Sequence, residues 1–199
     1  PPYSLLDWAR RQSIVPMATY PSRASFNQTV VDSLLSVPDK VVSLGLQNAF
    51  WDKTYEGKKI ISQSPKSEPD IQPTIHGLLY DICLAKNIQV SREYIVAGGQ
   101  LDFLFSGHFV DTTAEVCAEF KHAHSQDILH GLLKQLPAYM QAKGCDFGLY
   151  CVMYFKCTEF LEPQKYTDAN DLLFALDQER LLAGLANIRI LIMLSLIHI

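Results

Sequence analysis

Residues 114–141 read AEVCAEFKHAHSQDILHGLLKQLPAYMQ, and this stretch decides the fold. Its first part, AEVCAEFKH (114–122), alternates in character with a period of two and predicts a β-strand. The part that follows, continued to residue 144, repeats its apolar residues with helical spacing, with Ser125 as N-cap and Gly144 as C-terminal stop. A strand that leads into an amphipathic helix is typical of a sheet covered by helices.

The same two periodicities predict the elements on either side. Residues 67–87 place apolar side chains at 71, 75, 78, 79 and 82, which is the spacing of an amphipathic helix. The other predicted elements are strands over 88–97 and 100–107 joined by a turn at Gly98-Gly99, a strand over 145–156, a helix over 168–185 and a strand over 188–193. We therefore expect an α/β fold of the α+β type, with a central mixed β-sheet flanked by helices.

The core predicted in this way spans residues 67–193. Residues 1–66 are expected to form an N-terminal helical or irregular extension, with one or two helices broken at Pro38 and a polar, Lys-rich loop over 52–69. The last six residues, LSLIHI (194–199), resemble the translation of an adapter used in sequencing libraries, and we interpret them as a processing scar. An ordinary apolar strand end is the alternative.

Composition sets limits on the class of protein. The chain has 199 residues, 48% of them hydrophobic, and a net charge of −4. That charge gives no overall basic field of the kind that marks many nucleic-acid binders, although a local positive groove is compatible with it. The five cysteines form no CxxC motif and lie mostly in apolar stretches, which predicts reduced thiols in an intracellular, cytoplasmic protein. No apolar run is long enough to span a bilayer.

Three charged residues stand on two otherwise apolar strands. Alternation places Glu119 and Lys121 on one face of the strand over 114–122, and places Asp102 opposite the face shared by Leu101, Phe103 and Phe105. Burying such charges is costly unless they are paired or bind a metal. Two carboxylates suit Mg²⁺ or Mn²⁺, and a lysine beside them would position or deprotonate an attacking water or stabilise charge on a phosphate.

Two neighbouring helices offer further polar side chains. Gln135 and Tyr139 are one turn apart at the edge of the apolar arc of their helix, and are expected to reach back over the sheet edge. Glu68 falls on the buried side of the helix over 67–87 and is a candidate third carboxylate. Pro137 lies between Gln135 and Tyr139 and should kink that helix.

These residues resemble the motifs of the PD-(D/E)XK nuclease superfamily in its RecB-like branch. The family has an acid on the first helix, an Asp in the second strand of a hairpin, E-x-K on the third strand and Q-x-x-x-Y on the next helix. Here the matching residues are Glu68, Asp102, EFK (119–121) and QLPAY (135–139), with Leu101 where the family often has proline.

The resemblance implies a restriction-endonuclease-like core and hydrolysis of phosphodiester bonds, usually in DNA. It assigns Mg²⁺ or Mn²⁺ binding to Asp102 and Glu119 with help from Glu68, a catalytic role to Lys121, and orientation of Lys121 or the substrate to Gln135 and Tyr139. The partner is then a nucleic acid, and the sequence gives no oligomeric state.

Alternatives remain for each of these residues. In the simplest reading Glu119 and Lys121 form a salt bridge at a strand edge, and Asp102 caps the hairpin or accepts backbone hydrogen bonds. Gln135 and Tyr139 are then a polar helix edge with a half-buried tyrosine, and Glu68 interacts with the helix dipole. Lys53, Lys58, Lys59 and Lys66 are either a solvated loop or a phosphate-tracking surface. Two zinc sites are also possible in principle: one built from His122, His124 and His130, and one from Cys145, Cys151 and Cys157. For the three histidines we prefer phosphate-contacting or exposed side chains.

Alternatives also remain for the whole chain. One is a catalytically inactive nuclease fold that serves as a nucleic-acid or protein binding module. Another is a hydrolase of RNA or small molecules on the same fold. A third is a zinc hydrolase built on His122 and His124.

Overall fold

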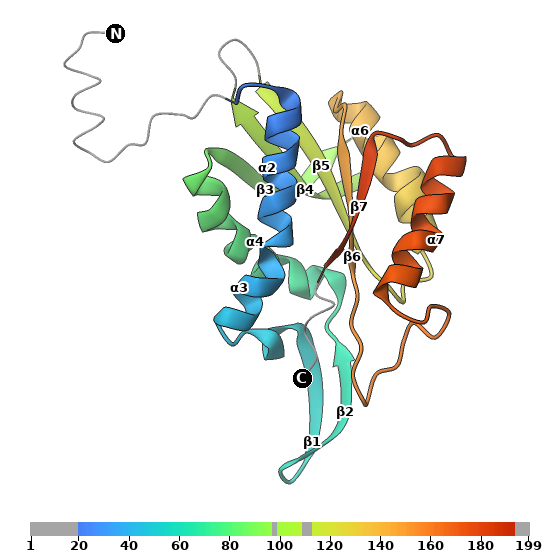
Figure 1. Ribbon diagram of the computed structural model, residues 1–199. Helices are drawn as coiled ribbons and strands as arrows, with labels where there is room; N and C mark the ends of the chain where they lie inside the picture. Colours follow the sequence, from blue (N-terminus) through green and yellow to red (C-terminus); the bar gives the residue numbers. More distant parts are fainter. Residues whose placement is uncertain (1–19, 97–98, 109–112, 194–199) are drawn as a thin grey trace, which may run out of the picture.

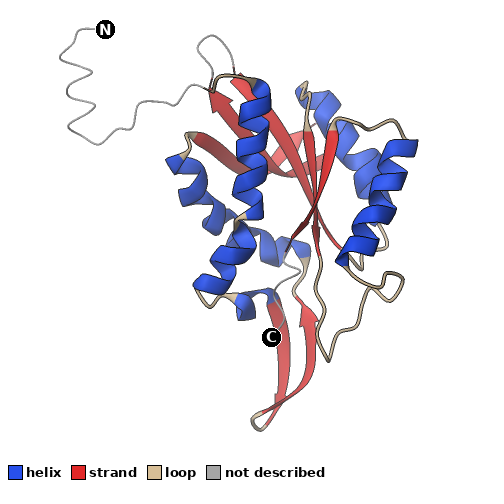
Figure 2. Cartoon of the chain, in the orientation of Figure 1, coloured by secondary structure: helices blue, strands red, loops and turns tan. Residues whose placement is uncertain are grey.

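A five-stranded mixed sheet lies at the centre of the molecule, with helices on both faces (Figure 1, Figure 2). The computed structural model describes residues 20–96, 99–108 and 113–193. The strands of this sheet are β3 (Ile88–Val96), β4 (Gly99–His108), β5 (Thr113–His122), β6 (Gly148–Met153) and β7 (Ile188–Met193). They lie in the order in which they are numbered; β3, β4 and β5 pair antiparallel, and β5, β6 and β7 pair parallel.

The helices of the described chain fall into two groups on opposite faces of the sheet (Figure 1). The first group is α2 (Arg23–Leu35), α3 (Val37–Ser43) and α4 (Glu68–Ala85). The second is α5 (Ile128–His130), the π-helical turn η2 (Gly131–Gln135), α6 (Leu136–Lys143) and α7 (Ala169–Leu182). A 3₁₀ turn, η1 (Gln47–Phe50), leads into a separate hairpin of β1 (Trp51–Glu56) and β2 (Lys59–Pro65). The predicted order of elements from residue 67 onward is confirmed.

Strand alternation divides the interior into two cores. Val116, Ala118 and Phe120 of β5 pack with α2, α3 and α4, whereas Cys117 of β5 packs with α6 and α7 on the other face. All four side chains are fully buried. Burial of a side chain as large as Phe120 contributes about 1.5–3 kcal/mol. The expected alternation of β5 is thus confirmed, with Glu119 on the face of Cys117.

The N-terminal part of the chain differs from the expectation. The two helices break at Ser36, and Pro38 belongs to the first turn of α3, where its missing N–H costs nothing. The predicted Lys-rich loop over 52–69 is wrong, because β1 and β2 pair through a two-residue turn that begins at Gly57, with φ of 61°. The boundary after residue 66 separates no cores, since Phe26 and Val30 of α2 join the same cluster as Ile71 of α4.

The strand β4 changes face at Asp102. Leu101 packs with the α6 side, whereas Phe103 and Phe105 pack with the α4 side, so the expected common face of these three residues is wrong. At the same point the β3–β4 ladder is interrupted: no pair is formed between Arg92↔Phe103 and Tyr94↔Leu101, and Glu93, opposite Asp102, adopts a positive φ of 54°.

Some predictions fall outside the described residues. These are the start of the N-terminal extension before residue 20, Gly98 of the predicted turn, and the six-residue tail from 194 to 199. In the described part of the chain, no helix combines the length and the apolar character needed to cross a bilayer.

Candidate active site

Three carboxylates and one ammonium meet where β4 and β5 separate. The β4–β5 ladder ends at the pair Phe103↔Ala118, so the following part of β5 has no neighbour on its β4 side. Lys121 of β5 places its Nζ 3.2 Å from Oε2 of Glu68, which begins α4, and 3.3 Å from Oε1 of Glu119. Together with Asp102 of β4 these residues form what we call the carboxylate cluster.

Two of the carboxylates accept the backbone hydrogen bonds that β4 would accept if it continued alongside β5. Odd-numbered N–H groups near the end of β5 point toward β6, as the bond from Ala123 N to Met153 O shows. The even-numbered ones point to the open side. There the N–H of Phe120 donates to Oδ2 of Asp102 at 2.7 Å, and the N–H of His122 donates to Oε1 of Glu68 at 2.7 Å. Backbone geometry therefore holds both side chains at this sheet edge.

A further polar side chain, Gln72 of α4, belongs to the site. Its Nε2 donates to Oδ1 of Asp102 at 2.6 Å, and the side chain is only 5% exposed. Sequence reasoning missed it, although a signal existed. Gln72 lies four residues after Glu68 and next to Ile71, so the helix presents Glu68 and Gln72 to the same edge of the sheet.

Burial opposes the charge on the two strand carboxylates. Burial raises the pKa of Glu119 to about 8, with the nearby Asp102 adding to the rise and Lys121 opposing it. Burial likewise raises the pKa of Asp102 to about 6, against the hydrogen bonds from Phe120 N and Gln72. Oε2 of Glu119 is buried without a hydrogen bond among the described residues. The cluster therefore has more negative charge than its surroundings stabilise.

Lys121 is the cation of the cluster. Burial lowers its pKa, but Glu119 and Glu68 outweigh that effect and raise the pKa above its ordinary value. Its aliphatic stem passes close to Gly131 in η2, where an added Cβ would lie 3.2 Å from Lys121 Cε and 2.8 Å from the hydroxyl of Tyr150. Gly131 was not predicted, although it stands four residues before Gln135 and eight before Tyr139 on the same helical stretch.

Gln135 and Tyr139 lie on the same helical stretch but make no hydrogen bond to Lys121 in the described structure. The hydroxyl of Tyr139 packs beside the backbone of Gly99, where an added Cβ would lie 2.6 Å from it. Oε1 of Gln135 is buried without a partner among the described residues. Pro137 lies in the first turn of α6, directly after the π-helical turn that ends at Gln135, and the expected kink stays a prediction.

The HAH histidines lie next to the cluster. The rings of His122 and His124 are 4.8 Å apart, and His122 is 5% exposed, so the expectation of an exposed side chain is wrong for it. Burial lowers the pKa of His122 to about 4, with the neighbouring His124 and Lys121 adding to the effect. His124 and His130 are exposed.

The donor set fits a hard divalent cation. Asp102, Glu119 and Glu68 offer carboxylate oxygens, the ligand type that Mg²⁺ and Mn²⁺ prefer, and Oε2 of Glu119 lacks a partner within the described chain. In the described residues no three His, Cys, Asp or Glu side chains already stand in a ligating arrangement. The ammonium of Lys121 lies between Glu68 and Glu119 and supplies part of the positive charge that the acids require.

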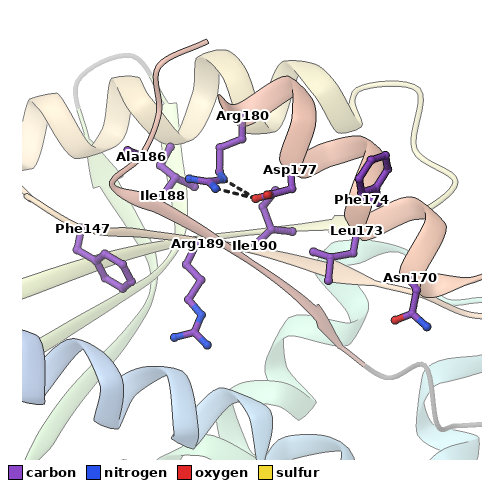
Figure 3. A pocket seen from close by; sticks show the side chains of 10 residues that line it. All are labelled: Phe147, Asn170, Leu173, Phe174, Asp177, Arg180, Ala186, Ile188, Arg189 and Ile190. Carbon is purple, nitrogen blue, oxygen red and sulfur yellow. Dashed lines mark hydrogen bonds and ion pairs between the residues drawn. The ribbon is translucent and has the colours of Figure 1, made fainter. Parts of the chain in front are cut away.

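A cavity of about 680 Å³ lies elsewhere, along β7 and α7 (Figure 3). Phe174 and the ion pair of Asp177 with Arg180 line its α7 side, and Arg189 comes from β7. No member of the carboxylate cluster lines it. The buried, unevenly balanced charges are at the cluster and not at this cavity, which makes the cluster the stronger candidate for a functional site.

Comparison with known proteins gives a family but no function. A family model described as a domain of unknown function (DUF8371) matches residues 27–157. The match includes all four residues of the carboxylate cluster, together with Gln72 and Gly131. A search of curated proteins finds no match.

Proposed function

The chain belongs to the DUF8371 family of domains of unknown function, and we propose that it is a metal-dependent nuclease that hydrolyses phosphodiester bonds in DNA. One observation carries the proposal. At an open sheet edge, Glu68 and Glu119 both contact the Lys121 ammonium. Asp102 is the third acid of the cluster, and the pKa values of Asp102 and Glu119 are raised to about 6 and about 8. Such an excess of buried negative charge favours the binding of a divalent cation.

The arrangement also supports the resemblance to PD-(D/E)XK nucleases. Glu68 begins the helix before the β3–β4 hairpin, Asp102 lies in the second strand of that hairpin, and Glu119 and Lys121 end the third strand. The sequence alone does not determine which acid of the first helix belongs to the site. Its contact with Lys121 gives an independent reason to assign Glu68 to the site.

The residues of the chain suggest a division of labour. Asp102 and Glu119 would hold Mg²⁺ or Mn²⁺, with Glu68 assisting. A bound divalent ion supplies Lewis-acid stabilisation of the charge that develops on the phosphate and an acidified water as nucleophile. The raised pKa of Lys121 keeps it protonated near neutral pH, so we assign it to charge stabilisation and orientation at the phosphate instead of proton abstraction.

The first experiment is cleavage of linear duplex, circular duplex and single-stranded DNA with Mg²⁺ or Mn²⁺. We expect cleavage that EDTA abolishes and that Glu119→Gln or Lys121→Met reduces by at least about 100-fold, the scale on which electrostatic groups act. The matched controls are Glu115→Gln and Lys143→Met. These residues form an ion pair at 3.1 Å that involves the same strand, outside the cluster, and the controls should retain activity.

Metal binding gives a second readout that needs no turnover. Titration of Mn²⁺ by calorimetry should show binding to the wild type and none to an Asp102→Asn/Glu119→Gln variant. Absence of both cleavage and Mn²⁺ binding in the folded wild-type protein would refute the nuclease proposal.

A second candidate is a nuclease fold that binds nucleic acid without cleaving it. The observation in its favour is the position of Lys121, whose ammonium already forms ion pairs with Glu68 and Glu119. In that case Lys121→Met should lower the free energy of unfolding by about 3–5 kcal/mol, because it leaves buried carboxylates unpaired, and Mn²⁺ should have no effect on either protein.

A further inference from the structure

The β1–β2 hairpin extends from the body of the molecule as a two-stranded ribbon (Figure 1). Its base is anchored by Trp51, whose ring lies 5.4 Å from that of Phe155 and 6.3 Å from that of Phe160. Beyond the base most side chains are exposed, including Tyr55 at 58% and Ile61 at 51%. Packing of the fold does not account for the outer half of this ribbon.

The ribbon carries a positive charge that the rest of the chain does not. Residues 51–66 contain four lysines against two acids, whereas the whole chain has a net charge of −4. Lys58 lies in the turn, Lys59 begins β2, and both are exposed. No ion pair or hydrogen bond of either ammonium is found among the residues that the structure describes. These charges are therefore available to a partner.

The ribbon is also joined to the carboxylate cluster. The chain passes from Pro65, the end of β2, to Glu68 in three residues, and the N–H of Lys66 donates to Phe50 O at the base of the hairpin. The ring of His124, which is next to the cluster, contacts Phe160 at 5.0 Å, and Phe160 contacts Trp51. A polymer bound at the cluster would thus pass the root of the ribbon.

We propose that this ribbon is an arm that holds duplex DNA through its phosphate backbone, an inference that rests on the proposed nuclease function. Lysines recognise phosphates without regard to sequence, and they give binding that weakens with salt. The strands have six and seven residues, which corresponds to a length of about 20 Å. A two-stranded ribbon of this length fits the major groove of B-DNA, which is about 12 Å wide.

The test is binding of a labelled duplex, measured by fluorescence anisotropy in EDTA over a range of NaCl concentrations. All proteins carry Glu119→Gln, so that no cleavage occurs. We expect Lys58→Ala/Lys59→Ala to weaken binding about ten-fold at low salt and to reduce the slope of log K against log [NaCl] by about 1.8, the loss of two phosphate contacts. Lys58→Arg/Lys59→Arg should bind like the parent protein.

The matched control removes two cations from the other end of the sheet. Arg23→Ala/Lys143→Ala breaks the ion pairs with Asp146 and Glu115 and lowers the net charge by the same amount. Equal duplex binding by the ribbon variant and its parent would overturn the proposal. So would a loss of the same size in the control, or a loss confined to a single-stranded probe of the same length.

The outcome also separates the arm from the nuclease. If the wild type cleaves no DNA but the ribbon variant loses duplex binding, the arm proposal stands and the nuclease proposal is refuted. If the wild type cleaves DNA but the ribbon variant binds the duplex normally, the nuclease proposal stands and the arm proposal is refuted. Because Lys58 and Lys59 are exposed, the ribbon variants should have the same melting temperature as their parent, which excludes misfolding as the cause.

Discussion

Glu119 lies 2% exposed on β5, with Oε1 3.3 Å from the Lys121 ammonium and Oε2 without a hydrogen bond in the described chain. Asp102 is held differently, since the Phe120 N–H and the Gln72 amide each occupy one of its oxygens. The two acids therefore have distinct parts in the site. Asp102 is fixed by donors, whereas Glu119 retains an oxygen free for a cation.

Gln72 provides the residue-scale prediction. Gln72→Leu leaves Oδ1 of the buried Asp102 carboxylate without its amide donor, and should lower the free energy of unfolding at pH 7 by about 1–3 kcal/mol. It should also raise the pKa of Asp102 further, because the bond from Gln72 lowers that pKa now. Chemical denaturation and carboxyl NMR titration measure the two effects.

The control for Gln72→Leu is Gln28→Leu. Gln28 makes the same type of bond, at 2.7 Å to Asp32, but on the exposed surface of α2. Its removal should change stability by less than about 0.5 kcal/mol, as is usual for surface substitutions. Equal effects of the two substitutions would mean that the Gln72–Asp102 bond has no special weight.

At the residue scale, the charged residues of the site could be predicted from the sequence, but the side chains that hydrogen-bond to them could not. Asp102, Glu119 and Lys121 stand out because charges are rare on apolar strands. Gln72 does not, because a glutamine on a half-exposed helix is ordinary and only the folded structure brings it to Asp102. The expectation that Gln135 and Tyr139 orient Lys121 stays a prediction, since the described structure shows no direct bond between them.

Elements with clear periodicity were predicted well, and those that depend on turn chemistry were not. From residue 67 onward the helices follow the sequence pattern because each has one face on the core, and the central strands β5 and β6 are short apolar runs buried on both faces. The hairpin of β1 and β2 is not predictable from periodicity, because its polar strands lack alternation and most of their side chains face water. Nor is the interruption of the β3–β4 ladder, which occurs where Glu93 adopts a positive φ, a rare conformation for a glutamate.

The π-helical turn η2 provides the element-scale prediction. Gly131→Ala would favour the helix by up to about 1 kcal/mol, but its Cβ would lie 2.8 Å from Tyr150 Oη and 3.2 Å from Lys121 Cε. The buried Tyr150 hydroxyl must then shift and Lys121 must give by a few tenths of an ångström. We therefore expect the proposed nuclease activity to fall about ten- to 100-fold, and the displacement of Tyr150 to offset the gain in helix stability.

Gly77→Ala is the matched control for this change. Gly77 lies in the middle of α4 with nothing within 4 Å of an added Cβ. The substitution should raise the free energy of unfolding by about 0.5–1 kcal/mol and leave activity unchanged. Comparable activities for the two alanine variants would show that Gly131 does not position Lys121.

At the scale of the whole molecule, two side chains at the open edge of the sheet have pKa values shifted in opposite directions. The pKa of Glu119 is raised from 4.5 to about 8, and that of His122 is lowered from 6.5 to about 4. Both shifts arise chiefly from burial between the two helical layers. The fold therefore holds one acid that resists ionisation and one base that resists protonation, and both make stability depend on pH.

The pH profile of stability gives the last prediction. As pH falls from about 8 to 6.5, folded Glu119 takes up its proton before the unfolded chain does, so the free energy of unfolding should rise by about 1–2 kcal/mol. Below pH 6.5 the unfolded chain protonates His122 first, which offsets the gain from Glu119 and levels the curve down to about pH 6. Below pH 6 folded Asp102 also takes up its proton before the unfolded chain does, so the free energy of unfolding should rise again. Urea denaturation across this range measures the profile in the absence of metal.

Two substitutions should separate the limbs of this profile. Glu119→Gln should remove the loss of stability between pH 6.5 and 8, whereas His122→Asn should let stability continue to rise below pH 6.5. Glu115→Gln and His130→Asn, which change more exposed side chains of the same types, should reproduce the wild-type curve.

Mn²⁺ should flatten the alkaline limb of the wild type, because a cation bound at Glu119 stabilises the ionised form that burial opposes. A Glu119→Gln curve parallel to that of the wild type would contradict the assignment of buried charge on which the metal site depends.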